Sequence, residues 1–129
     1  MTTIYERSTP AHLLDEEKLE RNIQRMQDLC SKSQKHLWPM VKTHKSTRIA
    51  LLQQKAGAEG FLTGTLDECE ALVDAGIRNL MYAYPTVGAV NLDRVLRLCE
   101  KCSLILRLDG LENARAVSEA AQRLSLIHI

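Results

Sequence analysis

The sequence predicts an α/β protein with a parallel β-sheet and helices packed outside it. Short apolar runs begin at residues 37, 60, 79 and 103, and a segment with helical spacing follows each of them. The strand-and-helix unit recurs about every twenty residues, which is typical of parallel sheets. An open doubly wound sheet and a barrel both satisfy this pattern.

The first helix, the first strand and the second helix occupy the first 57 residues. Residues 16–32 repeat apolar side chains at helical spacing, namely Leu19, Ile23, Met26 and Leu29. Residues 37–42 are expected to form a short strand. The next helix, over about 46–56, is expected to start at Ser46 or Thr47 and to stop at Gly57.

Three further strands are expected at residues 60–65, 79–84 and 103–108, each with a helix after it. Thr65 and Glu68 fit a capping box at the start of the helix that ends at Gly76. Asn91 is expected to cap the next helix, and the last helix spans about 111–123.

Chain length and glycine spacing narrow the choice between these two folds. A complete eight-unit barrel takes about 250 residues, and the 129 residues of this chain supply about half of them. No G-x-G-x-x-G follows a predicted strand, which weakens the case for a dinucleotide-binding fold.

Composition argues against several classes of protein. The 17 basic and 16 acidic residues give a net charge of +1, and aromatic residues make up only 4%, so no nucleic-acid surface is indicated. Neither a secretory signal nor a membrane span is evident, and we expect a cytoplasmic protein. The four cysteines, including Cys99 and Cys102, are then reduced structural thiols rather than a metal or redox site.

Lys42 is the main candidate for chemistry. A lysine at the end of an apolar strand is usually a solvated loop residue. The position also suits a lysine that forms a Schiff base, because the C-terminal ends of parallel strands face the ligand site and partial desolvation frees the amine. The residues alone leave both readings open.

Seven short motifs follow one another along the chain. They are Thr9-Pro-Ala-His-Leu-Leu-Asp15, Leu19-Glu-Arg-Asn-Ile23, Val41-Lys-Thr-His-Lys-Ser46, Ala56-Gly-Ala-Glu-Gly60, Thr65-Leu-Asp-Glu-Cys-Glu-Ala71, Ala75-Gly-Ile77 and Tyr84-Pro-Thr-Val-Gly88. In this order they resemble the D-threonine aldolase and D-serine dehydratase-like family, and the resemblance runs from about residue 9 to about residue 123. This family belongs with the alanine-racemase-type, fold-III pyridoxal-phosphate enzymes.

The resemblance implies the N-terminal half of a (β/α)8 TIM-type barrel, with pyridoxal 5'-phosphate bonded to Lys42. It implies a lyase of the aldolase or dehydratase type, acting on a small amino acid that can be D-configured. An amino-acid racemase of the same fold and a non-enzymatic pyridoxal-phosphate carrier remain alternatives. A divalent metal and a homodimeric partner are expected only in an intact parent, no nucleic acid or membrane partner is expected, and this chain alone is expected to be inactive.

One segment departs from the family pattern. Relatives commonly carry Arg-Pro-His where this chain has Trp38-Pro39-Met40. Side chains alternate along a strand, so if Lys42 points into the barrel, Met40 and Trp38 do too. The barrel floor would then be drier, which puts a close substrate analogy in doubt.

Four other residues are weighed for the site. His44 is a candidate for cofactor binding or proton transfer, although it has left the predicted strand. Tyr84 lines the site mouth or packs under a helix. Lys45 is read as a loop residue with an electrostatic role near the phosphate, and Arg107 as a barrel-interior or mouth residue.

The chain is expected to divide into an enzyme part, residues 1–123, and a non-native tail, residues 124–129. The tail Leu124-Ser-Leu-Ile-His-Ile129 is one translation of CTG TCT CTT ATA CAC ATC, which resembles a transposon-end sequencing adapter. Sequencing the locus from a library made without transposon tagging should diverge after codon 123. The same six residues followed by a natural stop codon would contradict this expectation.

Overall fold

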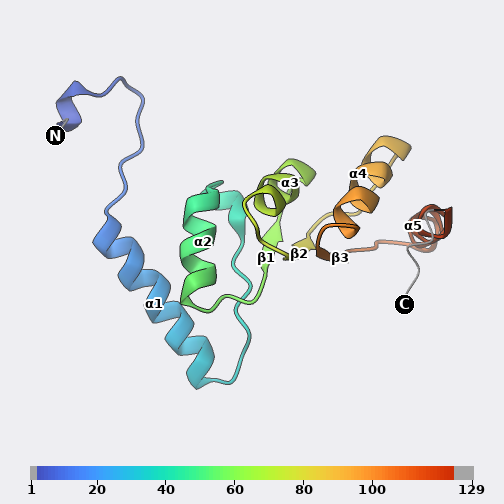
Figure 1. Cartoon of the computed structure of the whole chain (residues 1–129), viewed down its shortest axis with the longest axis horizontal. Coiled ribbons are helices and arrows are strands. Elements are labelled where there is room, and N and C mark those ends of the chain that lie inside the picture. The colour runs from blue at the N-terminus through green and yellow to red at the C-terminus, as the bar shows by residue number, and fades with distance from the viewer. Residues whose placement is uncertain (1–2, 124–129) are drawn as a thin grey trace.

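Strands and helices alternate along the chain as predicted. The computed structural model describes residues 3–123, so the expected tail at 124–129 lies outside the described residues. Figure 1 shows the elements, which are η1 (Ile4–Glu6), α1 (Glu16–Lys32), η2 (Val41–Thr43), α2 (Thr47–Ala56), β1 (Phe61–Thr63), α3 (Leu66–Asp74), β2 (Asn79–Tyr82), α4 (Ala89–Cys99), β3 (Ser103–Leu106) and α5 (Leu111–Arg123).

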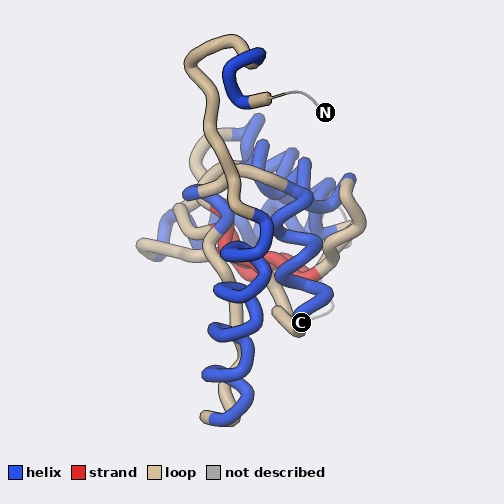
Figure 2. The backbone as a smooth tube through the Cα atoms, turned by 90° about the vertical axis from the view of Figure 1, so that its left-hand side faces the viewer, coloured by secondary structure: helices blue, strands red, loops and turns tan. Residues whose placement is uncertain are grey.

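The sheet is parallel and its strands lie in chain order, β1-β2-β3. Each strand is followed by a helix that returns the chain to the same edge, and α3 and α4 pack against each other outside the sheet. On the β1 side, α1 packs on α2, and the segment before α1 extends away from the rest (Figures 1 and 2). No helix within residues 3–123 has the length and apolar character needed to cross a bilayer.

The strand predicted at 37–42 is wrong for most of its length. Only Met40 pairs with the sheet, as an isolated parallel bridge to Leu62, and η2 follows at once. Pro39 has no N–H to give to a ladder, although its carbonyl accepts the amide of Leu62 at 2.9 Å. The chain therefore adds a short extended segment beside β1 and then turns at Val41.

Alternation along β1 divides the sheet into a covered face and an open face. Phe61 and Thr63 are completely buried beneath the helices, as is Leu80 on β2. Leu62 points to the other face and is only half-buried. In register with it, Ile105 on β3 is 46% exposed. The hydrophobic core lies between the sheet and the helices, and the opposite face is open.

The predicted limits of α2 and α3 are confirmed in their main features. The Ser46 side chain accepts the amide of Ile49, and Gly57 ends α2 with a φ of 119° that favours glycine. The Thr65 side chain accepts the amide of Glu68 at 3.1 Å. The Glu68 carboxylate does not return to Thr65 to complete the box and instead binds the Gly64 amide.

The cap predicted at Asn91 is wrong. Helix α4 begins two residues earlier, at Ala89, with Gly88 as its N-cap. Asn91 lies inside the first turn, where its side-chain amide donates to the carbonyl of Val87. Gly88 has a φ of 84°, so the chain enters the helix through a conformation that disfavours other residues.

Trp38 occupies the space that Gly60 leaves by having no side chain. A Cβ at Gly60 would lie 2.5 Å from the indole ring, closer than a carbon–carbon contact allows. Gly60 is buried and directly precedes β1. The glycine therefore sets how closely the Trp38 segment approaches the sheet.

Replacing Gly60 with alanine should lower the free energy of unfolding by about 1–3 kcal/mol, because the added methyl group overpacks against Trp38. Urea unfolding of Gly60→Ala, compared with Gly110→Ala, measures this effect. A Cβ at Gly110 meets nothing within 4 Å. Trp38→Leu in the Gly60→Ala background should recover part of the loss. Equal midpoints for Gly60→Ala and the wild type would contradict the argument.

Candidate active site

Lys42 lies in the short 3-10 turn η2, immediately after the bridge at Met40. The Val41 carbonyl accepts the amides of His44 at 3.1 Å and Lys45 at 2.9 Å, which closes the turn. Val41 is buried in the core at 2% exposure, whereas Lys42 is exposed. The turn is thus anchored on one side by an apolar side chain and presents the lysine on the other.

The Lys42 stem lies over Gly64, the residue directly after β1. The position of a Cβ at Gly64 would be 3.5 Å from Lys42 Cβ and 3.7 Å from its Cδ. Gly64 alternates with Leu62, so this side of the chain belongs to the open face of the sheet. Lys42 therefore stands at the C-terminal edge of β1, on the face that the helices leave uncovered.

The expected common face of Trp38, Met40 and Lys42 is consistent with these contacts. Trp38 lies against Gly60, Met40 pairs with Leu62, and Lys42 lies against Gly64. The three partners are alternate residues on one chain, so they face one way. The segment keeps its alternation relative to β1 although η2 interrupts its strand.

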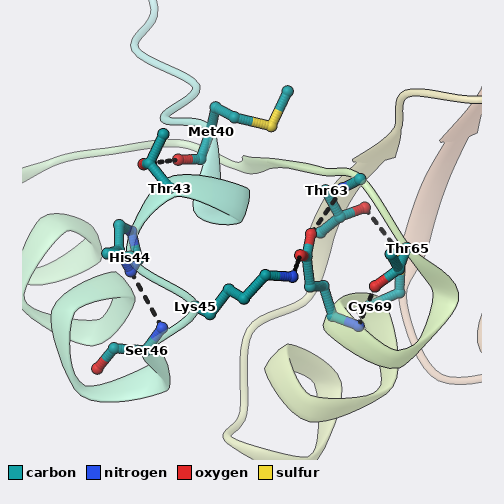
Figure 3. Close-up of polar contacts among 10 residues, drawn as sticks. Met40, Thr43, His44, Lys45, Ser46, Thr63, Thr65 and Cys69 are labelled. Atoms are coloured by element: carbon teal, nitrogen blue, oxygen red, sulfur yellow. Dashed lines mark hydrogen bonds and ion pairs between the residues drawn. The ribbon is translucent and has the colours of Figure 1, made fainter. Parts of the chain in front are cut away.

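Lys45 and Glu68 form an ion pair beside this turn. Lys45 Nζ lies 2.5 Å from Glu68 Oε1, and Glu68 Oε2 accepts the Gly64 amide at 2.7 Å. In Figure 3 the Lys45 side chain reaches from the turn towards the start of α3, where Thr65 lies. Burial acts to raise the pKa of Glu68, but the hydrogen bonds from Lys45 and Gly64 outweigh it and lower that pKa.

Glu68 is the functional candidate that sequence reasoning missed. Its motif predicted only a helix cap, because the sequence carries no sign that Lys45, 23 residues earlier, approaches it. The side chain is 8% exposed, which is unusual for a carboxylate and calls for a charged partner. The signal available in the sequence was an acidic residue in the first turn of the helix that follows a predicted strand.

His44 belongs to the same turn as Lys42, but its ring is engaged with the start of α2. Its Nδ1 accepts the Ser46 amide at 3.1 Å, a contact shown in Figure 3. Burial lowers the pKa of His44, while the side chain of Gln53 and the charge of Glu68 act in the opposite direction. The structure therefore brings His44 against α2.

Tyr84 and Arg107 follow β2 and β3 at the same edge of the sheet as Lys42. Tyr84 is 52% exposed, and Arg107 is exposed as well. Within residues 3–123 neither forms a hydrogen bond with Lys42 or His44. Burial chiefly raises the pKa of Tyr82, and Cys69 acts in the same direction.

The cysteines are free thiols in the positions expected of structural residues. Burial raises the pKa of Cys69 to about 11 and also raises the pKa values of Cys99 and Cys102. These thiols are therefore protonated near neutral pH and pack against the core. No group of three or more metal-ligating side chains occurs among the described residues.

A parallel array of strands, each followed by a helix, with an exposed lysine at the C-terminal edge of its first strand, is the arrangement of part of a β/α barrel. The chain belongs to the alanine racemase N-terminal domain family, whose model matches residues 14–128.

Curated relatives match most of this chain. It is 35% identical over 117 residues to D-threo-3-hydroxyaspartate dehydratase from Delftia sp. strain HT23, covering 90% of this chain. It is 29% identical over the same length to 3-hydroxy-D-aspartate aldolase from Paracoccus denitrificans. The chain spans 30% of the length of each relative.

Solved structures confirm the fold expected from the resemblance. D-threonine aldolase from Filomicrobium marinum superposes with a TM-score of 0.91 at 32% identity, over 95% of this chain and 33% of that one. D-threo-3-hydroxyaspartate dehydratase from Delftia sp. HT23 gives a TM-score of 0.88 at 32% identity, over 97% of this chain and 33% of that one. The chain corresponds to the N-terminal part of the fold-III barrel.

The half-buried imidazole of His44 should make stability depend on pH. Because the folded-state pKa lies below the ordinary value of 6.5, the unfolded chain binds more protons at this site. The stabilisation that comes from keeping His44 neutral is present above pH 6.5 and is lost as the pH falls below that value. The free energy of unfolding, measured across this range, should fall less steeply for His44→Asn. Identical slopes for variant and wild type would show that the ring titrates normally in the folded state.

Proposed function

We propose that this chain is the cofactor-bonding part of a pyridoxal-phosphate-dependent lyase that acts on small D-configured 3-hydroxy amino acids. The names of the relatives support the substrate class, since a D-threo-3-hydroxyaspartate dehydratase, a 3-hydroxy-D-aspartate aldolase and a D-threonine aldolase share that chemistry. The same names favour a lyase over a racemase or a non-enzymatic carrier.

The observation that carries the proposal is the placement of Lys42. Its side chain is exposed at the C-terminal edge of the sheet, and its amine forms no hydrogen bond or ion pair within residues 3–123. Gly64 supports the aliphatic stem without a side chain that would block the approach of a planar ring. An accessible amine on a closely packed stem fits an aldehyde cofactor.

Pyridoxal phosphate, when bound, supplies an electron sink for the bond that breaks at the substrate Cα. Lys42 is the residue that would hold the cofactor aldehyde. Its amine, when not bonded to the cofactor, would accept or donate a proton on one side of the substrate. The η2 turn keeps the aliphatic stem of Lys42 over Gly64, and Val41 anchors the backbone of the turn in the core.

His44 and Tyr84 take different parts in this proposal. His44 holds the turn by accepting the Ser46 amide, and the turn orients the Lys42 side chain. In this role His44 does not contact the cofactor. Tyr84, exposed at the same edge, lines the mouth of the site. The ligands of the phosphate, of the pyridine nitrogen and of any divalent metal come from parts of a longer protein that this chain does not include.

Lys42, and not Lys45, should carry the cofactor in the longer protein. After incubation with pyridoxal phosphate and reduction with borohydride, peptide mapping should find the label on Lys42. Lys42→Ala should lose both the label and the lyase turnover. A label on Lys45, with Lys42 unmodified, would contradict the proposal.

The 129-residue chain alone is the control for the longer protein, because a barrel site draws on loops from all the strands of the barrel. It should show no turnover with pyridoxal phosphate and divalent metal present. Lys42-dependent turnover by this chain alone would mean that the site is complete within it.

A further inference from the structure

The turn after Met40 carries two lysines, and an aldehyde cofactor at this edge could bond to either of them. Lys42 and Lys45 are three residues apart, and both side chains are exposed, that of Lys45 by 64%. An aldehyde bonds to any accessible deprotonated amine, so exposure alone does not separate the two. A cavity of about 300 Å³ borders Lys45 and is lined in part by Val41, Thr65 and Glu68, which gives a small molecule access to it.

Glu68 distinguishes the two amines. Its Oε1 binds Lys45 Nζ at 2.5 Å, and its Oε2 is held by the Gly64 amide at 2.7 Å. The carboxylate is 8% exposed, so leaving it without a cation would cost more than breaking a surface ion pair. The Lys45 amine is thereby engaged in an ion pair, whereas the Lys42 amine has no hydrogen-bond or ion-pair partner within residues 3–123.

The backbone conformation of Lys45 supports the importance of its contact with Glu68. Lys45 has a φ of 46°, in the left-handed region that residues with a side chain seldom adopt. Its amide still bonds to the Val41 carbonyl at 2.9 Å, so the turn is well formed. In this strained conformation the Lys45 side chain reaches α3, and the ion pair with Glu68 offsets the cost of the strain.

Glu68 also binds the backbone that lies beneath the Lys42 stem. The amide that it binds belongs to Gly64, and the same residue lies against the Lys42 stem. One carboxylate therefore joins the backbone under Lys42 to the amine of Lys45.

We propose that Glu68 is the positioning residue that selects Lys42 over Lys45 as the cofactor-bonding lysine, by holding the Lys45 amine in an ion pair and the Gly64 backbone beneath Lys42. This inference rests on the proposed function, since it assumes an aldehyde cofactor at this edge of the sheet.

The first test maps the label in the longer protein after treatment with pyridoxal phosphate and borohydride. Glu68→Gln keeps the shape and an oxygen for the Gly64 amide but removes the charge. Label on Lys45 relative to Lys42 should rise about fivefold, the effect of losing a partly exposed ion pair. Glu70→Gln is the matched control, because Glu70 lies on the same helix and pairs with Arg94 at 2.7 Å. It should label as the wild type does.

The second test needs no substitution, so it holds even if Glu68→Gln does not fold. In the unmodified protein without cofactor, limited acetylation should modify Lys42 about fivefold faster than Lys45 at low salt. The difference should shrink near 1 M salt, where the Debye length is about 3 Å. Equal rates at low salt would overturn the inference.

The outcomes separate this inference from the proposed function. Wild-type label chiefly on Lys42, with a share on Lys45 that rises about fivefold in Glu68→Gln, supports both. Wild-type label on Lys42 with an unchanged pattern in Glu68→Gln overturns the role of Glu68 and leaves the function standing. Wild-type label on Lys45, or on neither lysine, overturns the proposed function and this inference with it.

Discussion

The alternation of side chains along β1 is the constraint on which the rest of the structure depends. Phe61 and Thr63 are completely buried, so the covered face of β1 cannot change without opening the core. That requirement turns Gly60 and Gly64 to the open face. Because neither carries a side chain, the Trp38 ring and the Lys42 stem can approach the sheet. Core packing on one face thus places the exposed Lys42 side chain on the other.

Glu68 connects this arrangement to the helices. Its backbone amide is capped by Thr65, and its carboxylate turns back to Gly64 and Lys45. A buried carboxylate is tolerated only with such partners, because desolvation otherwise disfavours its charge. The helix cap, the backbone under Lys42 and the ion pair therefore form one electrostatic unit.

Sequence reasoning succeeded where the signal is local. Ser46, Gly57 and Thr65 act as the predicted helix boundaries because capping depends on atoms only a few residues away. It failed at residues 37–42 and at Asn91. An apolar run does not show that Pro39 limits its pairing, and a residue with a good capping side chain can be displaced by a glycine that bends the chain earlier.

The sequence by itself determined the parallel α/β class and the order of the elements from residue 46 onward, and it proposed Lys42 as the candidate for chemistry, since periodicity and motif order are properties of the chain alone. Only the tertiary structure decided that Lys42 stands over Gly64 and that Lys45 meets Glu68. The physical reason is separation along the chain. Contacts between residues about twenty positions apart depend on how the β1 register and the helix packing bring them together, and no local pattern encodes that distance.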